Sequence, residues 1–112
     1  MKRSMLILLV VAALGVAATA QARVATGTLA GTVLDAHGKP VAHATVTIQT
    51  SYGDHPNATH TDANGHFAFA RYRTGQYDVR AYADGLFSAW TKRVLIRSHR
   101  TTEVTLRLPA AK

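Results

Sequence analysis

Apolar and polar residues alternate with a period of two along almost the whole chain after Thr26, and this alternation constrains the fold more than any other feature. The alternating runs are short and are separated by Gly, Pro, Asn and Asp, which favour turns. Such runs are typical of half-buried strands, because successive side chains of a strand point to opposite faces of its sheet. No segment of useful length has the spacing of an amphipathic helix. The sequence therefore predicts an all-β fold.

Seven strands are predicted from these runs, over residues 27–35, 43–50, 57–62, 66–70, 76–84, 87–97 and 101–108. Their number and spacing are typical of a seven-stranded antiparallel Greek-key β-sandwich, with an antiparallel barrel as the alternative. Phe67 and Phe69 share one face of their strand and are assigned to the core. Because Asn64-Gly65 favours a tight two-residue turn, the strands 57–62 and 66–70 are expected to pair as a hairpin.

The N-terminal segment has the organisation of a secretory signal peptide. A basic start is followed by an apolar run from Met5 to Ala18 and by the small-residue exit Ala20-Gln21-Ala22. The apolar run is shorter than the ~20 residues of a spanning helix. We therefore expect residues 1–22 to be a signal peptide and residues 23–112 to form one exported domain, periplasmic or secreted. After cleavage no stable membrane span is expected, although retention of the segment as an anchor remains open.

Composition narrows the classes of function. The chain has no cysteine, which excludes a disulfide-stabilised scaffold and a thiol nucleophile. It carries a net charge of +7 and has a pI of about 10.4, which favours contact with polyanions. Since the domain is expected to be exported, nucleic acid is not an expected partner.

Six short motifs occur in a characteristic order along the mature chain. They are Gly31-Thr32-Val33-Leu34-Asp35, Gly38-Lys39-Pro40-Val41-Ala42, Ala44-Thr45-Val46, Thr61-Asp62-Ala63-Asn64-Gly65-His66-Phe67, Gly75-Gln76-Tyr77 and Ala83-Asp84-Gly85-Leu86. Together they resemble the carboxypeptidase regulatory-like domain family over residues 27–108. The resemblance implies the prealbumin-like (transthyretin-like) sandwich. It also implies a non-catalytic role, since such domains usually accompany carboxypeptidases, outer-membrane receptor systems and adhesive or carbohydrate-binding-like surface proteins.

Three of the six histidines are candidates for a metal site. His60 and His66 flank the expected hairpin turn, and His55 lies in the loop before it. Imidazole is a good ligand for Cu²⁺ and Zn²⁺, so these side chains would form a copper or zinc site if the register brought them together. The alternative is that all three are solvated surface residues. No other cofactor is expected.

A possible ligand surface is assigned to the loop residues Arg71, Tyr72 and Arg73 and to Trp90, the only tryptophan. If Trp90 faced outward with Tyr82 or Tyr72, the rings would form a stacking platform for a sugar. If it faced inward, Trp90 would complete the core.

Catalysis is not expected. The chain has no Gly-x-Ser-x-Gly motif, and Asp35, Asp62 and Asp84 lie beside turn glycines, where turn bonding accounts for them. The sequence therefore predicts an exported, non-catalytic binding or structural module that contacts a cell-envelope protein or glycan. The alternative is an exported metal-binding module that uses the histidine hairpin. The oligomeric state is left open.

Overall fold

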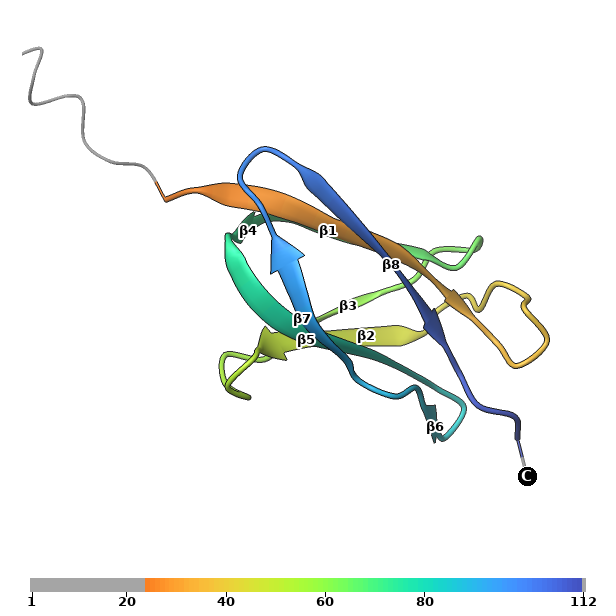
Figure 1. Cartoon of the computed structure of the whole chain (residues 1–112). Coiled ribbons are helices and arrows are strands. Elements are labelled where there is room, and N and C mark those ends of the chain that lie inside the picture. Colours follow the sequence, from red (N-terminus) through yellow and green to blue (C-terminus); the bar gives the residue numbers. More distant parts are fainter. Residues whose placement is uncertain (1–23, 112) are drawn as a thin grey trace, which may run out of the picture.

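A computed structural model describes residues 24–111, and in this range the chain is a two-sheet β-sandwich without helices (Figure 1). The predicted signal peptide lies outside the described residues. The eight strands are β1 (Thr26–Leu34), β2 (Thr45–Thr50), β3 (Asn57–His60), β4 (His66–Arg73), β5 (Gly75–Ala83), β6 (Leu86–Phe87), β7 (Thr91–Ile96) and β8 (Thr101–Arg107). The predicted sandwich is therefore confirmed.

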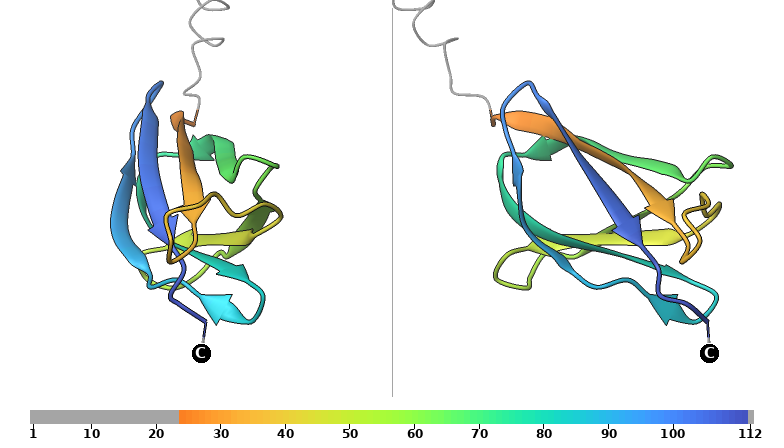
Figure 2. Two further views of the ribbon diagram at one scale, coloured as in Figure 1. Left: turned by 90° about the vertical axis from the view of Figure 1, so that its right-hand side faces the viewer. Right: turned by 45° about the vertical axis from the view of Figure 1, so that its right-hand side comes forward.

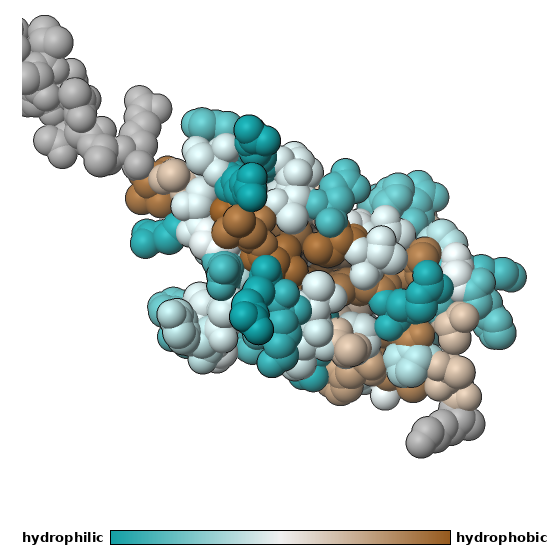
Figure 3. Space-filling model, in the orientation of Figure 1, coloured by the Kyte–Doolittle hydropathy of each residue, from teal (hydrophilic) through white to brown (hydrophobic). Residues whose placement is uncertain are grey.

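One sheet has three strands in the order β4-β1-β8, and the other contains β3, β2 and β5, with both β6 and β7 paired to β5. The alternation of apolar and polar residues gives each sheet one apolar face, and these two faces pack together. In β1 every second residue is buried, and in β5 the side chains of Tyr77, Val79 and Ala81 face the core. Phe67 and Phe69 are both buried, as predicted. In the view of Figure 3 a band of apolar residues crosses the molecule between β8 and β7, where the two sheets meet at their edges.

Gly31 lies at a crowded point of β1. A Cβ atom there would lie 2.3 Å from the Val104 carbonyl oxygen and 2.7 Å from the Phe67 ring. Only glycine allows β8 and the Phe67 ring to approach this strand so closely.

The pairing of β1 with β8 differs from the predicted antiparallel arrangement. The two strands run parallel, in a register that extends from Thr28 opposite Thr101 to Leu34 opposite Arg107. β7 belongs to the five-stranded sheet, and the turn 97–100 carries the chain across to the other sheet. The chain therefore re-enters the three-stranded sheet at the end where β1 begins, which makes the pair parallel.

The hairpin predicted between 57–62 and 66–70 is wrong, although its turn is present. The Asp62 and His66 backbones close the turn, and Gly65 has a φ of 79°. The flanking strands nevertheless separate, because β3 pairs with β2 while β4 pairs with β1. Thr61, at the crossing point, is buried. Its hydroxyl donates to the Val41 carbonyl at 2.6 Å and accepts from the Ala44 N–H at 2.8 Å.

The predicted strand 87–97 is divided in two. β6 ends at Phe87, and the chain leaves the sheet until Thr91. The buried Ser88 lies in this gap, where its hydroxyl accepts a hydrogen bond from the Ala81 N–H at 2.9 Å and donates to the Ala89 carbonyl. These bonds hold residues 88–90 against β5 and place Trp90 beside the outer face of that strand.

The two ends of the described chain lie at opposite ends of the sandwich, as the views of Figures 1 and 2 agree. Within residues 24–111, no helix is long and apolar enough to cross a membrane.

Candidate functional site: an exposed aromatic surface

The outer face of the five-stranded sheet carries two large side chains of β5. Because Tyr77, Val79 and Ala81 point into the core, Arg80 and Tyr82 point outward. The short strand β6 pairs with the end of β5 so that Phe87 lies opposite Tyr82. Tyr82 and Phe87 are 39% and 50% exposed, although each has a large apolar ring. Strand pairing thus brings two aromatic rings to the solvent side of the sheet.

Arg80 connects these rings to Trp90. Its guanidinium carbon lies 4.1 Å from the centre of the Phe87 ring and 4.5 Å from that of the Trp90 ring. The Tyr82 and Phe87 ring centres are 4.6 Å apart. We refer to Arg80, Tyr82, Phe87 and Trp90 as the aromatic surface. Trp90 is half-buried, so it neither enters the core nor stands alone on the surface.

The aromatic surface combines two kinds of binding chemistry. Ring faces attract C–H groups and cations, whereas the guanidinium offers N–H donors in a fixed plane. Thr45 and Thr47 lie opposite Tyr82 and Arg80 on the neighbouring strand β2, and both are half-buried. Their register adds hydroxyl groups beside the rings.

The Arg71–Arg73 segment does not join this surface. It forms the end of β4 in the other sheet rather than a loop, and Arg71 has a φ of 54° at a point where the β1–β4 register shifts. Tyr72 packs against the core, with its ring centre 5.5 Å from that of Phe69 and 5.3 Å from that of Tyr77. The structure therefore separates Arg71, Tyr72 and Arg73 from Trp90.

The three candidate metal ligands are all exposed but lie on different elements. His60 is in β3, whereas His66 is in β4 of the other sheet. His55 is in the loop after β2, where its Nδ1 atom is 3.1 Å from an Asp54 carboxylate oxygen. Within residues 24–111, no group of three or more His, Cys, Asp or Glu side chains is arranged to hold a metal ion. Metal binding by His55, His60 and His66 stays a prediction from the sequence.

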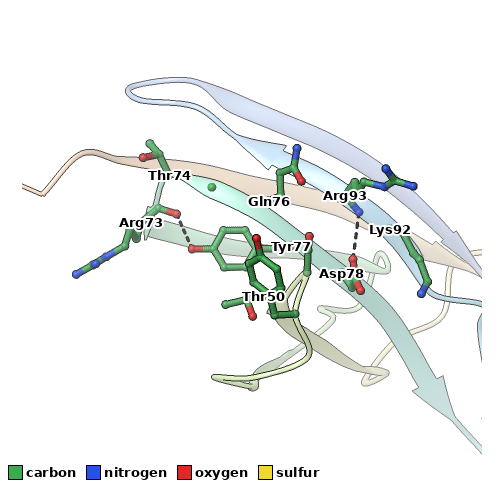
Figure 4. A pocket seen from close by; sticks show the side chains of 11 residues that line it. Thr50, Arg73, Thr74, Gln76, Tyr77, Asp78, Lys92 and Arg93 are labelled. Atoms are coloured by element: carbon green, nitrogen blue, oxygen red, sulfur yellow. Dashed lines mark hydrogen bonds between the residues drawn. The ribbon is translucent and has the colours of Figure 1, made fainter.

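A hollow of about 620 Å³ lies where the loop after β2 meets the beginnings of β5 and β7 (Figure 4). The Tyr77 hydroxyl donates to the Arg73 carbonyl at 2.7 Å, and burial raises the pKa of this phenol. At the other side of the hollow the Arg93 N–H donates to Asp78 at 3.1 Å. Both contacts are hydrogen bonds between a side chain and the backbone, so they fix the shape of this end of the sheet.

Two turn aspartates serve the fold. Asp35 accepts backbone hydrogen bonds from Lys39 and His37, and Asp62 accepts them from His66 and Asn64. These bonds hold the pKa of both carboxyl groups below the ordinary value of 3.8. Such bonding agrees with the turn role expected for them.

Sequence reasoning missed Arg80 and Phe87 as members of the site. The period of β5 already places Arg80 on the same face as Tyr82, so the signal for that residue was present. Phe87 was assigned to one long strand, and only the break at Ser88 reveals its pairing with Tyr82.

Comparisons with solved structures support the fold. The chain is similar to the minor pilin of Streptococcus agalactiae, with a TM-score of 0.65 and 21% identity over 79% of this chain and 46% of that one. It is similar to catechol 1,2-dioxygenase from Pseudomonas arvilla C-1, with a TM-score of 0.61 and 15% identity over 83% of this chain and 55% of that one. It is also similar to a candidate carbohydrate-binding protein from Pseudomonas aeruginosa, with a TM-score of 0.52 and 15% identity over 80% of this chain and 92% of that one. These identities show a shared fold alone.

No curated protein matches the chain. Residues 28–109, which include every strand from β2 to β8 and most of β1, match the family described as the carboxypeptidase regulatory-like domain. The chain belongs to the carboxypeptidase regulatory-like domain family.

Proposed function

We propose that the chain is an exported, non-catalytic module that binds a cell-envelope component, a glycan or a protein, through the aromatic surface. The observation that carries this proposal is the Arg80 guanidinium held between the Phe87 and Trp90 rings on an open sheet face. Large exposed rings cost solvation free energy in a soluble domain, and their clustering is typical of a recognition site. The similar fold of the candidate carbohydrate-binding protein from Pseudomonas aeruginosa agrees with a glycan as the ligand.

The shape of the surface favours a sugar over a small enclosed ligand. A pyranose ring presents a C–H face that stacks on an aromatic ring, and its hydroxyl groups need hydrogen-bond partners at the edges. Tyr82 and Phe87 supply the rings, while Thr45, Thr47 and Arg80 offer polar atoms beside them. The surface is open, so it suits a chain of sugars that extends across the strands.

Trp90 is the natural reporter for the test, because it is the only tryptophan in the chain. The full chain, purified as produced, is titrated with soluble peptidoglycan fragments and with purified envelope polysaccharides while Trp90 emission is recorded. We expect at least one probe to shift or quench the emission. Phe87→Ala, which leaves the reporter in place, is expected to weaken that binding about 10-fold.

Tyr52→Ala is the matched control, since Tyr52 is an exposed aromatic residue (95%) that lies outside the aromatic surface. This variant is expected to bind as the unaltered chain does. The proposal fails for glycans if no probe alters Trp90 emission. It fails for the aromatic surface if Phe87→Ala and Tyr52→Ala bind equally well.

A further inference from the structure

The basic side chains gather at the end of the sandwich where the described chain begins. Arg73 lies opposite Thr26 at the start of β1. On the other side of β1, the turn between β7 and β8 is tied to the same residues, because the His99 N–H donates to the Thr26 carbonyl and the Thr28 N–H donates to the Arg100 carbonyl, both at 2.9 Å. The basic end is defined here by four exposed side chains, Arg71, Arg73, Arg97 and Arg100.

The turn carboxylates lie at the opposite end. Asp35 follows β1, Asp62 precedes β4 and Asp84 follows β5, and these three strand ends all point away from the basic end. Lys39 and Arg107 also lie there, so acids and bases nearly balance. The end where β1 begins therefore carries more net positive charge than the opposite end.

Little at the basic end neutralises this charge. Within residues 24–111 no arginine forms an ion pair with a carboxylate. Asp54, in the loop beside Arg73, is engaged by the Thr50 hydroxyl and by His55 instead. Four guanidinium groups at one end of a small domain repel one another, and an anionic partner would relieve this repulsion.

The described part of the chain begins at the same end. Val24, the first described residue, is an exposed apolar side chain (59%). A cluster of basic residues beside an exposed apolar side chain favours the headgroup region of an anionic membrane.

We propose that the basic end is a docking surface for an anionic lipid membrane, on which the domain rests as a peripheral module. This contact goes beyond the proposed glycan or protein binding and uses different residues. β5 runs from Gly75 at the basic end to Ala83 at the other, so Tyr82 and Phe87 lie roughly 20 Å further along the molecule. Electrostatic attraction to a membrane decays over about 8 Å at physiological salt. The aromatic surface is thus held beyond the lipid headgroups, where it is open to a second partner.

The test measures co-sedimentation of the full chain with vesicles of phosphatidylcholine alone and with vesicles that contain roughly one-third phosphatidylglycerol. The chain is expected to bind the anionic vesicles only, and less as salt is raised. The variant R97Q/R100Q removes two charges from the basic end. Its matched control, K39Q/R107Q, removes two charges from the opposite end.

Both variants lower the net charge by two, so a difference in their vesicle binding shows that the position of the charges matters and not only their number. We expect R97Q/R100Q to bind about 30-fold more weakly, since each basic residue near an anionic surface contributes about a factor of five. K39Q/R107Q should bind within about twofold of the unaltered chain. If R97Q/R100Q fails to fold by circular dichroism, R71Q against R107Q makes the same comparison.

Equal losses in the two variants would overturn the docking surface in favour of net charge alone. Binding to a soluble acidic polysaccharide such as heparin, without binding to anionic vesicles, would overturn the membrane as the partner. Phe87→Ala is expected to bind vesicles normally, so failure of this proposal and failure of the proposed function are distinguishable.

Discussion

Thr61 is the residue on which the crossing between the two sheets depends. It occupies the one position where β3 and β4 part, and it is 3% exposed. Its single hydroxyl satisfies the Ala44 N–H, which is buried, and the carbonyl of the half-buried Val41, two backbone groups that lack a strand partner at this point. Removal of that oxygen leaves both groups unpaired.

Thr61→Val is therefore expected to lower the free energy of unfolding by about 2–3 kcal/mol, because valine keeps the shape but satisfies neither backbone group. Thr59→Val, on the edge strand β3 and only half-buried, should change it by less than about 0.5 kcal/mol. Urea unfolding of the two variants makes the comparison. A small effect at Thr61 would mean that water replaces the hydroxyl.

Single residues show where sequence reasoning succeeds. The two-residue alternation alone was enough to place Phe67, Phe69 and Val79 in the core, because side chains in a strand point in only two directions. Thr61 could not be distinguished from the exposed threonines around it, since its burial depends on a crossing between sheets. Trp90 was undecided for a similar reason, because its position depends on the Ser88 hydrogen bonds outside any strand.

Among the elements, the two aspartate-centred turns make the stability dependent on pH. Asp35 and Asp62 have pKa values below 3.8 in the folded chain, chiefly because of the backbone hydrogen bonds from Lys39 and His66. A carboxylate with a lowered pKa stabilises the fold above its ordinary pKa, and this contribution is lost as the pH falls through the folded value. The folded state should therefore weaken below about pH 4.

Asp62→Asn tests this dependence, because asparagine keeps an oxygen acceptor but carries no charge. The variant should be less stable than the unaltered chain at pH 7, and the difference should shrink as the pH falls toward ~2. Asp84→Asn is the control, since the Asp84 carboxylate accepts no hydrogen bond from residues 24–111. Unfolding by urea across this pH range gives the result, and a constant difference between Asp62→Asn and the unaltered chain would refute the explanation.

Strand ranges could be predicted far better than strand partners. The range of a strand follows from its own alternation of apolar and polar residues and from the turn residues at its ends. Its partner depends instead on which sheet the chain joins after the next turn. Asn64-Gly65 favours a tight turn in either case, so the separation of β3 from β4 left no local signal. The parallel pairing of β1 with β8 joins residues more than 70 positions apart and has no local signal either.

At the scale of the whole molecule, β8 closes the sandwich. It covers β1 on one side and contributes Leu106 (1% exposed) to the shared core, and Leu108 (5% exposed), which follows the strand directly, adds to it. The chain has no cysteine, so burial of such side chains must supply the stability that disulfides give many other small domains.

Leu106→Ala is expected to destabilise the whole fold by about 2–5 kcal/mol, as burial of the leucine is lost and a cavity remains. Leu95→Ala is the matched control, because Leu95 in β7 is 40% exposed, and it should cost less than about 1 kcal/mol. Thermal unfolding of both variants by circular dichroism is the measurement. Similar losses for the two leucines would contradict the role assigned to β8.

The parallel pair β1–β8 also limits the order in which the strands can pair as the chain is delivered. Whatever delivers this chain from its N-terminus, a ribosome or a translocation channel, releases β1 first and β8 last. β1 is the central strand of its sheet, and until residue 107 has emerged one of its edges has no partner. The three-stranded sheet therefore stays incomplete until residues 101–107 are free to pair with β1. The complete three-stranded sheet can form only after residue 107 has emerged, although the pairs β1–β4 and β2–β5 do not need β8.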